Sequence, residues 1–188
     1  MLDIKGMDWL ELVLQNDLPH QQKAVDVICD ALNGANISAP AFYYLNPSIN
    51  IYDPNIAVNI KTIQMNVHPD IRGSHDVGKY LGLDIKMETG TGKTYVYTKT
   101  IFELHKRFGL NKFIIAVPTL PIKAGTRQFI ADEYVKRHFS DVCGYNSEID
   151  LGVLESIKKR KVSFSFPALW ENLLRAHPKI KIKFMFYL

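Results

Sequence analysis

The sequence has few cysteines, no long apolar run and no secretory start. Cys29 and Cys143 are its only cysteines, too few and too far apart to predict a disulfide framework or a zinc site. No stretch approaches the roughly 18 consecutive apolar residues that a membrane-spanning helix needs. Residues 1–6 lack the basic segment and the apolar segment that begin a secretory signal. We therefore expect a cytoplasmic protein that does not contact a membrane.

The composition excludes a disordered chain. Of the 188 residues, 47% are hydrophobic and 22% are charged, which is enough apolar material for a sizeable core in one domain. The formal net charge of +4 is compatible with a polyanionic partner, and an ordinary basic surface explains it equally well.

A glycine-rich turn at residues 87–94, Met-Glu-Thr-Gly-Thr-Gly-Lys-Thr, separates two different hydrophobic periods. Before it, every second residue from Leu81 to Met87 is apolar, which predicts a strand. After it, the spacing becomes helical, and Gly109 is expected to end the helix. The residues on this helical face are Tyr97, Ile101, Leu104 and Phe108. A turn between a strand and a helix N-terminus directs backbone N–H groups at one anion.

The residues of this turn match the needs of a nucleoside triphosphate. The candidate binding residues are Gly90, Thr91, Gly92, Lys93 and Thr94. Glycines let the backbone approach phosphate oxygens, Lys93 would contact the β- and γ-phosphates, and the Thr94 hydroxyl would bind Mg²⁺. The general pattern G-x-x-x-x-G-K-[ST] requires glycine at position 87, where this sequence has methionine. We interpret the turn as an ATP site; a glycine turn that merely precedes a helix is the alternative.

A second helix is predicted from Pro19 to Gly34, with an apolar stripe at helical spacing. Gln21 lies in its first turn. An amide both donates and accepts, as the N6/N7 edge of adenine requires, so Gln21 could read that base. On spacing alone, a solvated glutamine at a helix start is the favoured interpretation.

Residues 35–80 are predicted to be an insertion rich in proline and aromatic residues. Ile56 to Val67 could form one or two strands. Four potential metal ligands follow, but they lack a ligand spacing on a recognisable element, so a solvated turn is favoured. These are His68, Asp70, His75 and Asp76.

After the helix that follows the glycine turn, the apolar run from Phe113 to Val117 predicts a strand buried on both faces. This strand would complete a βαβ unit. Pro118 to Thr126 would then be a loop at the carboxyl end of a parallel strand, where α/β proteins bind ligands. Its hydroxyls and Lys123 suit contacts to a nucleic-acid backbone. A turn selected only for proline and glycine geometry is an equally good interpretation.

Three segments together resemble the amino-terminal part of the restriction (Res) subunit of type III restriction-modification enzymes, which are superfamily-two helicase-like ATPases. They are Leu-Pro-His-Gln-Gln at 18–22, Leu-Asp-Ile-Lys leading into the glycine turn at 83–94, and Ile-Ala-Val-Pro-Thr at 115–119 with Ile-Lys-Ala-Gly at 122–125. The resemblance covers most of residues 15–140, and methionine is normal in that family at the start of the phosphate motif.

The resemblance implies an α/β fold, a P-loop RecA-like helicase lobe with a parallel sheet flanked by helices. It implies that Gln21 contacts adenine, that Gly90 to Thr94 are motif I, and that motif Ia faces DNA. The implied DNA contacts are Pro118, Thr119, Lys123 and Thr126. It also implies ATP and Mg²⁺ as cofactors. The implied partners are DNA and a modification methyltransferase (Mod) subunit. In the intact enzyme, Mod would supply site recognition, and ATP-dependent communication along DNA between recognition sites would precede cleavage of unmodified foreign DNA.

The family's Walker B acidic pair, second lobe and nuclease domain are not recognisable here. Asp132 and Glu133 are interpreted as part of a helix that follows motif Ia. The expected organisation is amino-terminal helices with the Gln element at 1–34, the insertion at 35–80, and an incomplete ATPase lobe at 81–188. We therefore expect the chain alone to bind nucleotide weakly and neither to hydrolyse ATP efficiently nor to cut DNA.

The carboxyl-terminal stretch predicts a strand at Asp141 to Tyr145, a basic run at 158–161 and a helix after Pro167. Lys179 to Leu188 alternates into an apolar end, a strand prone to aggregation unless something covers it. We hypothesise a truncated product of a longer reading frame, with or without a frameshifted tail. The alternatives are another superfamily-two DNA translocase, of type I restriction or repair, and a non-enzymatic remnant or interaction module.

Overall fold

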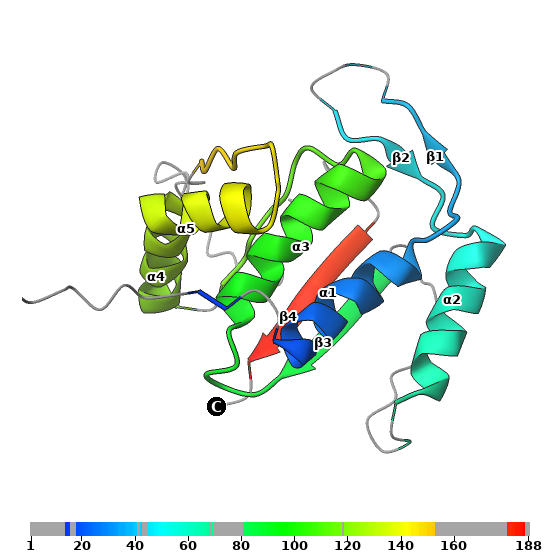
Figure 1. Ribbon diagram of the computed structural model, residues 1–188. Coiled ribbons are helices and arrows are strands. Elements are labelled where there is room, and N and C mark those ends of the chain that lie inside the picture. The colour runs from blue at the N-terminus through cyan, green and yellow to red at the C-terminus, as the bar shows by residue number, and fades with distance from the viewer. Residues whose placement is uncertain are drawn as a thin grey trace, which may run out of the picture.

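The computed structural model describes residues 14–15, 18–40, 42, 45–67, 69, 81–117, 119–152 and 180–186. It is a mixed α/β structure (Figure 1). The elements, in chain order, are α1 (Pro19–Ala31), β1 (Ile37–Ser38), β2 (Ser48–Ile49), α2 (Pro54–Met65), β3 (Leu81–Met87), α3 (Lys93–Phe108), α4 (Leu120–Ala131), α5 (Glu133–Arg137), the π-helix η3 (His138–Val142) and β4 (Ile180–Phe186). Within these ranges, no helix has both the length and the apolar character needed to cross a bilayer.

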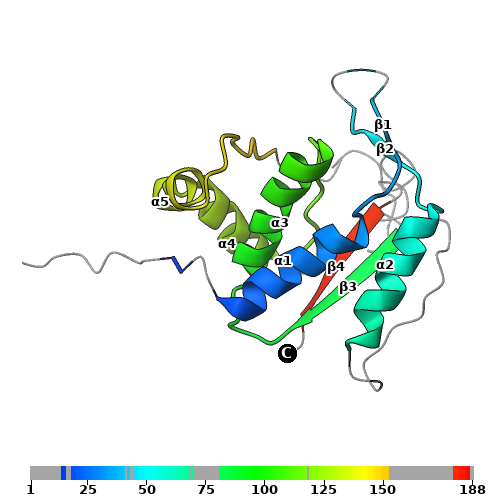
Figure 2. The same ribbon diagram turned by 45° about the vertical axis from the view of Figure 1, so that its right-hand side comes forward.

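The strands form two separate ladders. β3 and β4 pair in parallel along their whole length, from Leu81 opposite Ile180 to Met87 opposite Phe186. β1 and β2 form a short antiparallel pair. Figures 1 and 2 show α1 crossing in front of the β3–β4 pair, with α3 on one side of it and α2 on the other. Helix α1 therefore lies over the strand pair and contacts both α2 and α3.

Two hydrophobic clusters stabilise this arrangement. The main cluster brings together α1, α2, α3, β3 and the segment around β2, and its buried residues are Val25, Ile28, Cys29, Leu32, Ile49, Ile51, Ile56, Leu81, Val96, Leu104 and Leu110. A second cluster, largely aromatic, lies between α3 and the segment from α5 onwards. Its buried residues are Tyr95, Phe102, Val135, Phe139 and Tyr145. Because α3 contributes to both clusters, it is buried on several faces.

The three predicted elements around the glycine turn are confirmed. Strand β3 spans Leu81–Met87, and its exposure alternates along the chain as the period-two pattern predicted. Helix α3 ends at Gly109, whose φ of +67° is a left-handed conformation suited to glycine. Helix α1 begins at Pro19 as expected, and Gly34 follows its end with φ of +69°.

The prediction of strands between Ile56 and Val67 was wrong, because most of this segment is helix α2. The side chain of Asp53 caps the helix by accepting from Asn55 N, and Pro54 occupies the first turn. The less exposed apolar side chains then recur at helical spacing, at Ile56, Ile60, Ile63 and Val67. These start signals and this period favour a helix over the β-branched composition that suggested strands.

The predicted strand at 113–117 is not formed among the described residues. Exposure alternates along this segment, and Ile114 is 45% exposed, so it is not buried on both faces. Its start is held instead by Asn46, whose amide donates to Lys112 O and whose Oδ1 accepts from Lys112 N, both at 2.8 Å. The parallel partner of β3 is β4. An apolar run has the same pattern whether or not a partner strand pairs with it.

Two further local predictions were wrong. Residues 120–126 are not loop but the first part of helix α4, which Thr119 caps and which has Pro121 in its first turn. These are helix-start signals, and the helix tolerates Gly125. Asp141 to Tyr145 is not a strand, because the chain continues from α5 through η3, where Cys143 N donates to His138 O at 3.1 Å. Buried Phe139 anchors this turn in the aromatic cluster.

The expected strand near the carboxyl end is confirmed for Ile180–Phe186, and its pairing with β3 provides a cover for the backbone edge that the sequence alone left open. The basic run at 158–161, the helix after Pro167 and the four potential metal ligands of the insertion lie outside the described residues. In the part of the chain that is described, no three His, Cys, Asp or Glu side chains gather as a metal site.

Candidate nucleotide-binding site

The loop between β3 and α3 is a tight turn built on two left-handed glycines. Gly90 and Gly92 both have φ of +82°, a conformation that other residues adopt only with strain. The Thr91 hydroxyl donates to Glu88 O at 2.7 Å, and Lys93 Nζ donates to the same carbonyl at 2.5 Å. Glu88 O thus accepts hydrogen bonds from the side chains of both Thr91 and Lys93.

Lys93 and Thr94 are the first two residues of helix α3. Lys93 is buried, so its ammonium lies beside the backbone of the loop rather than in bulk solvent. Thr94 is half-buried, and its carbonyl accepts from Thr98 Oγ1 at 2.8 Å. The positive end of the α3 dipole lies at this turn, which favours an anion there.

Gln21 contacts the loop directly. Its Nε2 donates to Thr91 O at 3.0 Å, and the adjacent His20 Nε2 lies 3.3 Å from the same carbonyl. The approach is close enough that a Cβ at position 92 would lie 2.3 Å from Gln21 Nε2. Gly92 therefore provides both the turn geometry and the room for the Gln21 amide.

Among the residues that the structure describes, none donates a hydrogen bond to the other end of the Gln21 amide. Gln21 is only 7% exposed, and its Oε1 is buried without a hydrogen-bond donor. A buried acceptor left unpaired costs about 1–3 kcal/mol, so a donor supplied by a ligand would relieve it. A Cβ at Gly90 would meet no atom of the described part of the chain within 4 Å, which leaves space beside that part of the loop. The residues present therefore fit a bound nucleotide.

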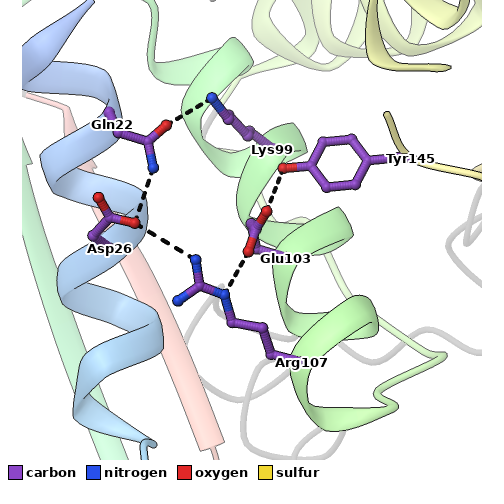
Figure 3. Close-up of polar contacts among 6 residues, drawn as sticks. All are labelled: Gln22, Asp26, Lys99, Glu103, Arg107 and Tyr145. Atoms are coloured by element: carbon purple, nitrogen blue, oxygen red, sulfur yellow. Dashed lines mark hydrogen bonds and ion pairs between the residues drawn. The ribbon is translucent and has the colours of Figure 1, made fainter. Parts of the chain in front are cut away.

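A polar network lies beside the site, between α1 and α3 (Figure 3). Lys99 Nζ donates to Gln22 Oε1 at 2.8 Å, and Gln22 Nε2 donates to Asp26 Oδ1 at 2.9 Å. Arg107 connects the two helices, with Nη2 3.7 Å from Asp26 Oδ1 and Nε donating to Glu103 Oε2 at 2.5 Å. These contacts fix the turn of α1 that follows Gln21 against α3.

The network extends to the segment after η3, where Tyr145 Oη donates to Glu103 Oε1 at 2.7 Å. Burial disfavours the charged form of Glu103, but the hydrogen bonds from Tyr145 and Arg107 and the positive charges of Arg107 and Lys106 together outweigh it, so the pKa of Glu103 lies below its usual value. Burial, with Glu103 as the acceptor, raises the pKa of Tyr145. Glu103 is thus held as a carboxylate that joins the network to the aromatic cluster.

Three of the four predicted DNA-contacting residues, Thr119, Lys123 and Thr126, lie at the start of α4 rather than in one loop. Thr119 is exposed and caps the helix, and Lys123 is half-buried. Thr126 is buried, with its Oγ1 2.7 Å from Tyr97 Oη on α3. Pro118 lies outside the described residues. The structure brings the six predicted nucleotide-contacting residues together. The described DNA-contact candidates differ in burial, since Thr119 is exposed, Lys123 is half-buried and Thr126 is buried.

Tyr95, His138 and Cys143 form a separate set of polar contacts in the aromatic cluster. Tyr95 Oη is 3.1 Å from His138 Nε2, and Cys143 Sγ is 3.6 Å from the same nitrogen. Burial, assisted by the nearby Lys99 charge, lowers the pKa of His138, so the neutral imidazole is favoured.

Several residues near the site were not identified from the sequence. His20 lies in the Leu-Pro-His-Gln-Gln segment but was given no role, and nothing local predicts that Lys99 reaches Gln22 on another helix. The Glu103–Arg107 pair could have been found, because glutamate four residues before arginine on a helix is a recognisable pairing.

Comparison with known proteins identifies the family. The family model "Type III restriction enzyme, res subunit" matches residues 16–168. The chain is 42% identical over 151 residues to the type III restriction-modification enzyme EcoPI Res subunit of Escherichia phage P1, and 40% identical over 152 residues to the EcoP15I Res subunit of Escherichia coli. It is 38% identical over 130 residues to the StyLTI Res subunit of Salmonella typhimurium.

These matches cover 77%, 77% and 68% of this chain, but only 15%, 15% and 11% of the respective relatives. The chain therefore corresponds to a small part of the length of each relative. The matched residues include α1, the glycine turn and α3, and they end before β4. The chain belongs to the type III restriction enzyme Res subunit family.

Proposed function

We propose that this chain binds Mg-ATP at the turn between β3 and α3, with Gln21 reading the adenine base. The observation that carries the proposal is the buried Gln21 amide, which donates to the loop at Thr91 O and has an unpaired acceptor. Adenine N6 is a donor that can satisfy such an acceptor. One amide would thus hold both the base and the loop that binds the phosphates.

The phosphates would be bound by the turn and the start of α3. The left-handed glycines Gly90 and Gly92 allow the backbone N–H groups, including that of Thr91, to converge on phosphate oxygens. Lys93 would exchange its bond with Glu88 O for the β- and γ-phosphates. The Thr94 hydroxyl would be a ligand of Mg²⁺, which when bound would offset the negative charge of the phosphates.

We further propose that the chain represents part of a RecA-like motor lobe. In a complete Res subunit, this lobe would couple ATP hydrolysis to communication along DNA, followed by Mg²⁺-dependent cleavage of unmodified foreign DNA. A Mod methyltransferase subunit would supply site recognition. Family membership supports this proposal. DNA would be contacted at the start of α4 by Thr119, Lys123 and Thr126, and by Pro118, which precedes them in the sequence. Thr126 would have to exchange its contact with Tyr97.

Thermal unfolding with and without Mg-ATP tests the nucleotide site. A ligand at about 100 times its Kd stabilises a folded binder by about 2.7 kcal/mol, so Mg-ATP should raise the Tm of the wild-type chain. Lys93→Ala should abolish the rise, because it removes the cation that contacts the phosphates. A wild-type transition indifferent to saturating Mg-ATP would refute the proposal, as would an equal rise in Lys93→Ala.

A phosphate-release assay tests the second part of the proposal. The chain alone should show no DNA-stimulated ATP hydrolysis, because hydrolysis in this class needs acidic and arginine residues from further motifs. Release of phosphate above background that requires DNA and disappears in Lys93→Ala would contradict this expectation.

A further inference from the structure

The turn of α1 that carries Gln21 is held by its neighbour in sequence. Gln22 is engaged at both ends of its amide, because Oε1 accepts from Lys99 Nζ at 2.8 Å and Nε2 donates to Asp26 Oδ1 at 2.9 Å. Figure 3 shows the Gln22 amide lying between Lys99 of α3 and Asp26 of its own helix. The orientation of Gln22 is therefore determined by both helices.

The Lys99 end of this network is the buried end. Lys99 is 8% exposed, and its ammonium also lies 5.9 Å from the centre of the Tyr95 ring. The Asp26 and Arg107 side chains are each 41% exposed, so water screens their interaction. Of these two polar contacts between α1 and α3, the bond from Lys99 to Gln22 is thus the more buried and the one nearer to Gln21.

A shift of α1 would change the contact between Gln21 and the phosphate loop. Gln21 directly precedes Gln22 in the first turn of α1, and its Nε2 donates to Thr91 O at 3.0 Å. A hydrogen bond weakens steeply when donor and acceptor separate or misalign, so a small rotation or slide of α1 would move the Gln21 amide away from the loop. Lys99 itself belongs to the helix that begins at the loop, so it connects the two halves of the candidate site through a rigid element.

We propose that Lys99, acting through Gln22, is a positioning residue that holds Gln21 in register with the phosphate loop and thereby sets the preference of the site for adenine. This inference rests on the proposed function, in which Gln21 reads the base. In this proposal Lys99 acts through Gln22, to which its Nζ donates, and not by contacting the nucleotide. Its removal should therefore weaken recognition of the base while leaving recognition of the phosphate chain intact.

The test compares ATP with inorganic tripolyphosphate, both with Mg²⁺, as ligands of the full chain. In Lys99→Met, the Kd for ATP should rise about five- to tenfold, the size of one lost hydrogen bond, and the Kd for tripolyphosphate should change less than about twofold. Lys99→Arg, which keeps the charge and the donor, should retain most of the preference for ATP. Lys23→Met is the matched control, because Lys23 is exposed on α1 next to Gln22.

A double-mutant cycle separates positioning from a general effect on the fold. Gln21→Ala should weaken ATP binding by a similar factor, and adding Lys99→Met to it should weaken ATP binding no further, since both changes remove the same contact to the base. Gln22→Met, which removes the intermediary at a half-buried position, should give the same result and serves if Lys99→Met does not fold.

The outcomes distinguish this inference from the proposed function. Equal weakening of ATP and tripolyphosphate in Lys99→Met, or additive losses in the double variant, would overturn the positioning role while the proposed function stands. A wild-type chain that binds neither ligand, or that binds both equally well, would overturn the proposed adenine site and this inference with it.

Discussion

The absence of a side chain at position 92 leaves room for the Gln21 amide beside the loop. Gly90 and Gly92 share the same left-handed φ, yet only at Gly92 would a Cβ meet a neighbour, Gln21 Nε2 at 2.3 Å. The two glycines therefore make the same demand on the backbone and different demands on packing.

This difference predicts unequal effects of two alanine substitutions. Gly90→Ala should cost about 1–2 kcal/mol from the left-handed backbone alone. Gly92→Ala should cost about 1 kcal/mol more, because the end of Gln21 must move and its bond to Thr91 O is lost. Urea denaturation measures both. In a Gln21→Ala background the two substitutions should become equal; a difference that persists there would contradict the explanation.

Cys29 predicts an alkaline loss of stability. Burial raises the pKa of this thiol, which is 1% exposed, from 9.0 to about 11. Because the pKa is higher in the folded state, the folded chain holds the thiol proton more tightly than the unfolded chain does. This contribution to the free energy of unfolding is complete below pH 9 and is lost as the pH rises through about 11, by an amount on the order of 2–3 kcal/mol. Denaturant titrations at pH 8 to 11 should show a shallower decline in Cys29→Ala than in wild type. Parallel declines would count against the assignment.

At the scale of secondary structure, helix α2 depends on one carboxylate. Asp53 is buried, with Oδ1 accepting from Asn55 N and Oδ2 from Asn36 N, both at 2.9 Å. It thus caps the helix and also anchors the chain that leads into β1.

Asp53→Ala should therefore destabilise the chain by about 2 kcal/mol, about 1 for the helix cap and about 1 for the second bond. Asp53→Asn is the matched control, because its single amide oxygen can satisfy only one of the two N–H groups, and it should cost about half as much. Chemical denaturation gives both values. An alanine variant as stable as wild type would show that α2 forms without this cap.

At the same scale, local start and stop signals were sufficient for α1, β3 and α3. Proline in the first turn of α1, a period of two in β3 and a left-handed glycine after α3 each act within a few residues. The same kinds of signal were present at Asp53–Pro54 and at Thr119–Pro121, where apolar composition and an expected loop were given more weight. Those two errors were avoidable in principle.

At the scale of the whole molecule, the β3–β4 pair joins segments far apart in sequence. Its parallel register runs from Leu81 with Ile180 to Met87 with Phe186, and β4 lies beyond the residues that match the family model. Deleting residues 179–188 should therefore free the amides of β3.

Hydrogen exchange measures this effect. Peptides covering 81–87 should exchange at least about tenfold faster in the deletion variant, which corresponds to a loss of about 1.4 kcal/mol of local protection. Peptides from α4, which contacts α3 and α5, are the internal control. Unchanged exchange in 81–87 would show that β4 does not protect β3 in solution.

The sequence by itself determined the local elements around the glycine turn, the residue types of the candidate nucleotide site and the family. These depend on backbone preference, hydrophobic period and short motifs, which act over a few residues. Only the tertiary structure decided that β4 rather than 113–117 pairs with β3, that Gln21 reaches Thr91, and that Lys99 holds Gln22. Such contacts join segments whose local patterns are compatible with several partners, so packing of the whole chain selects among them.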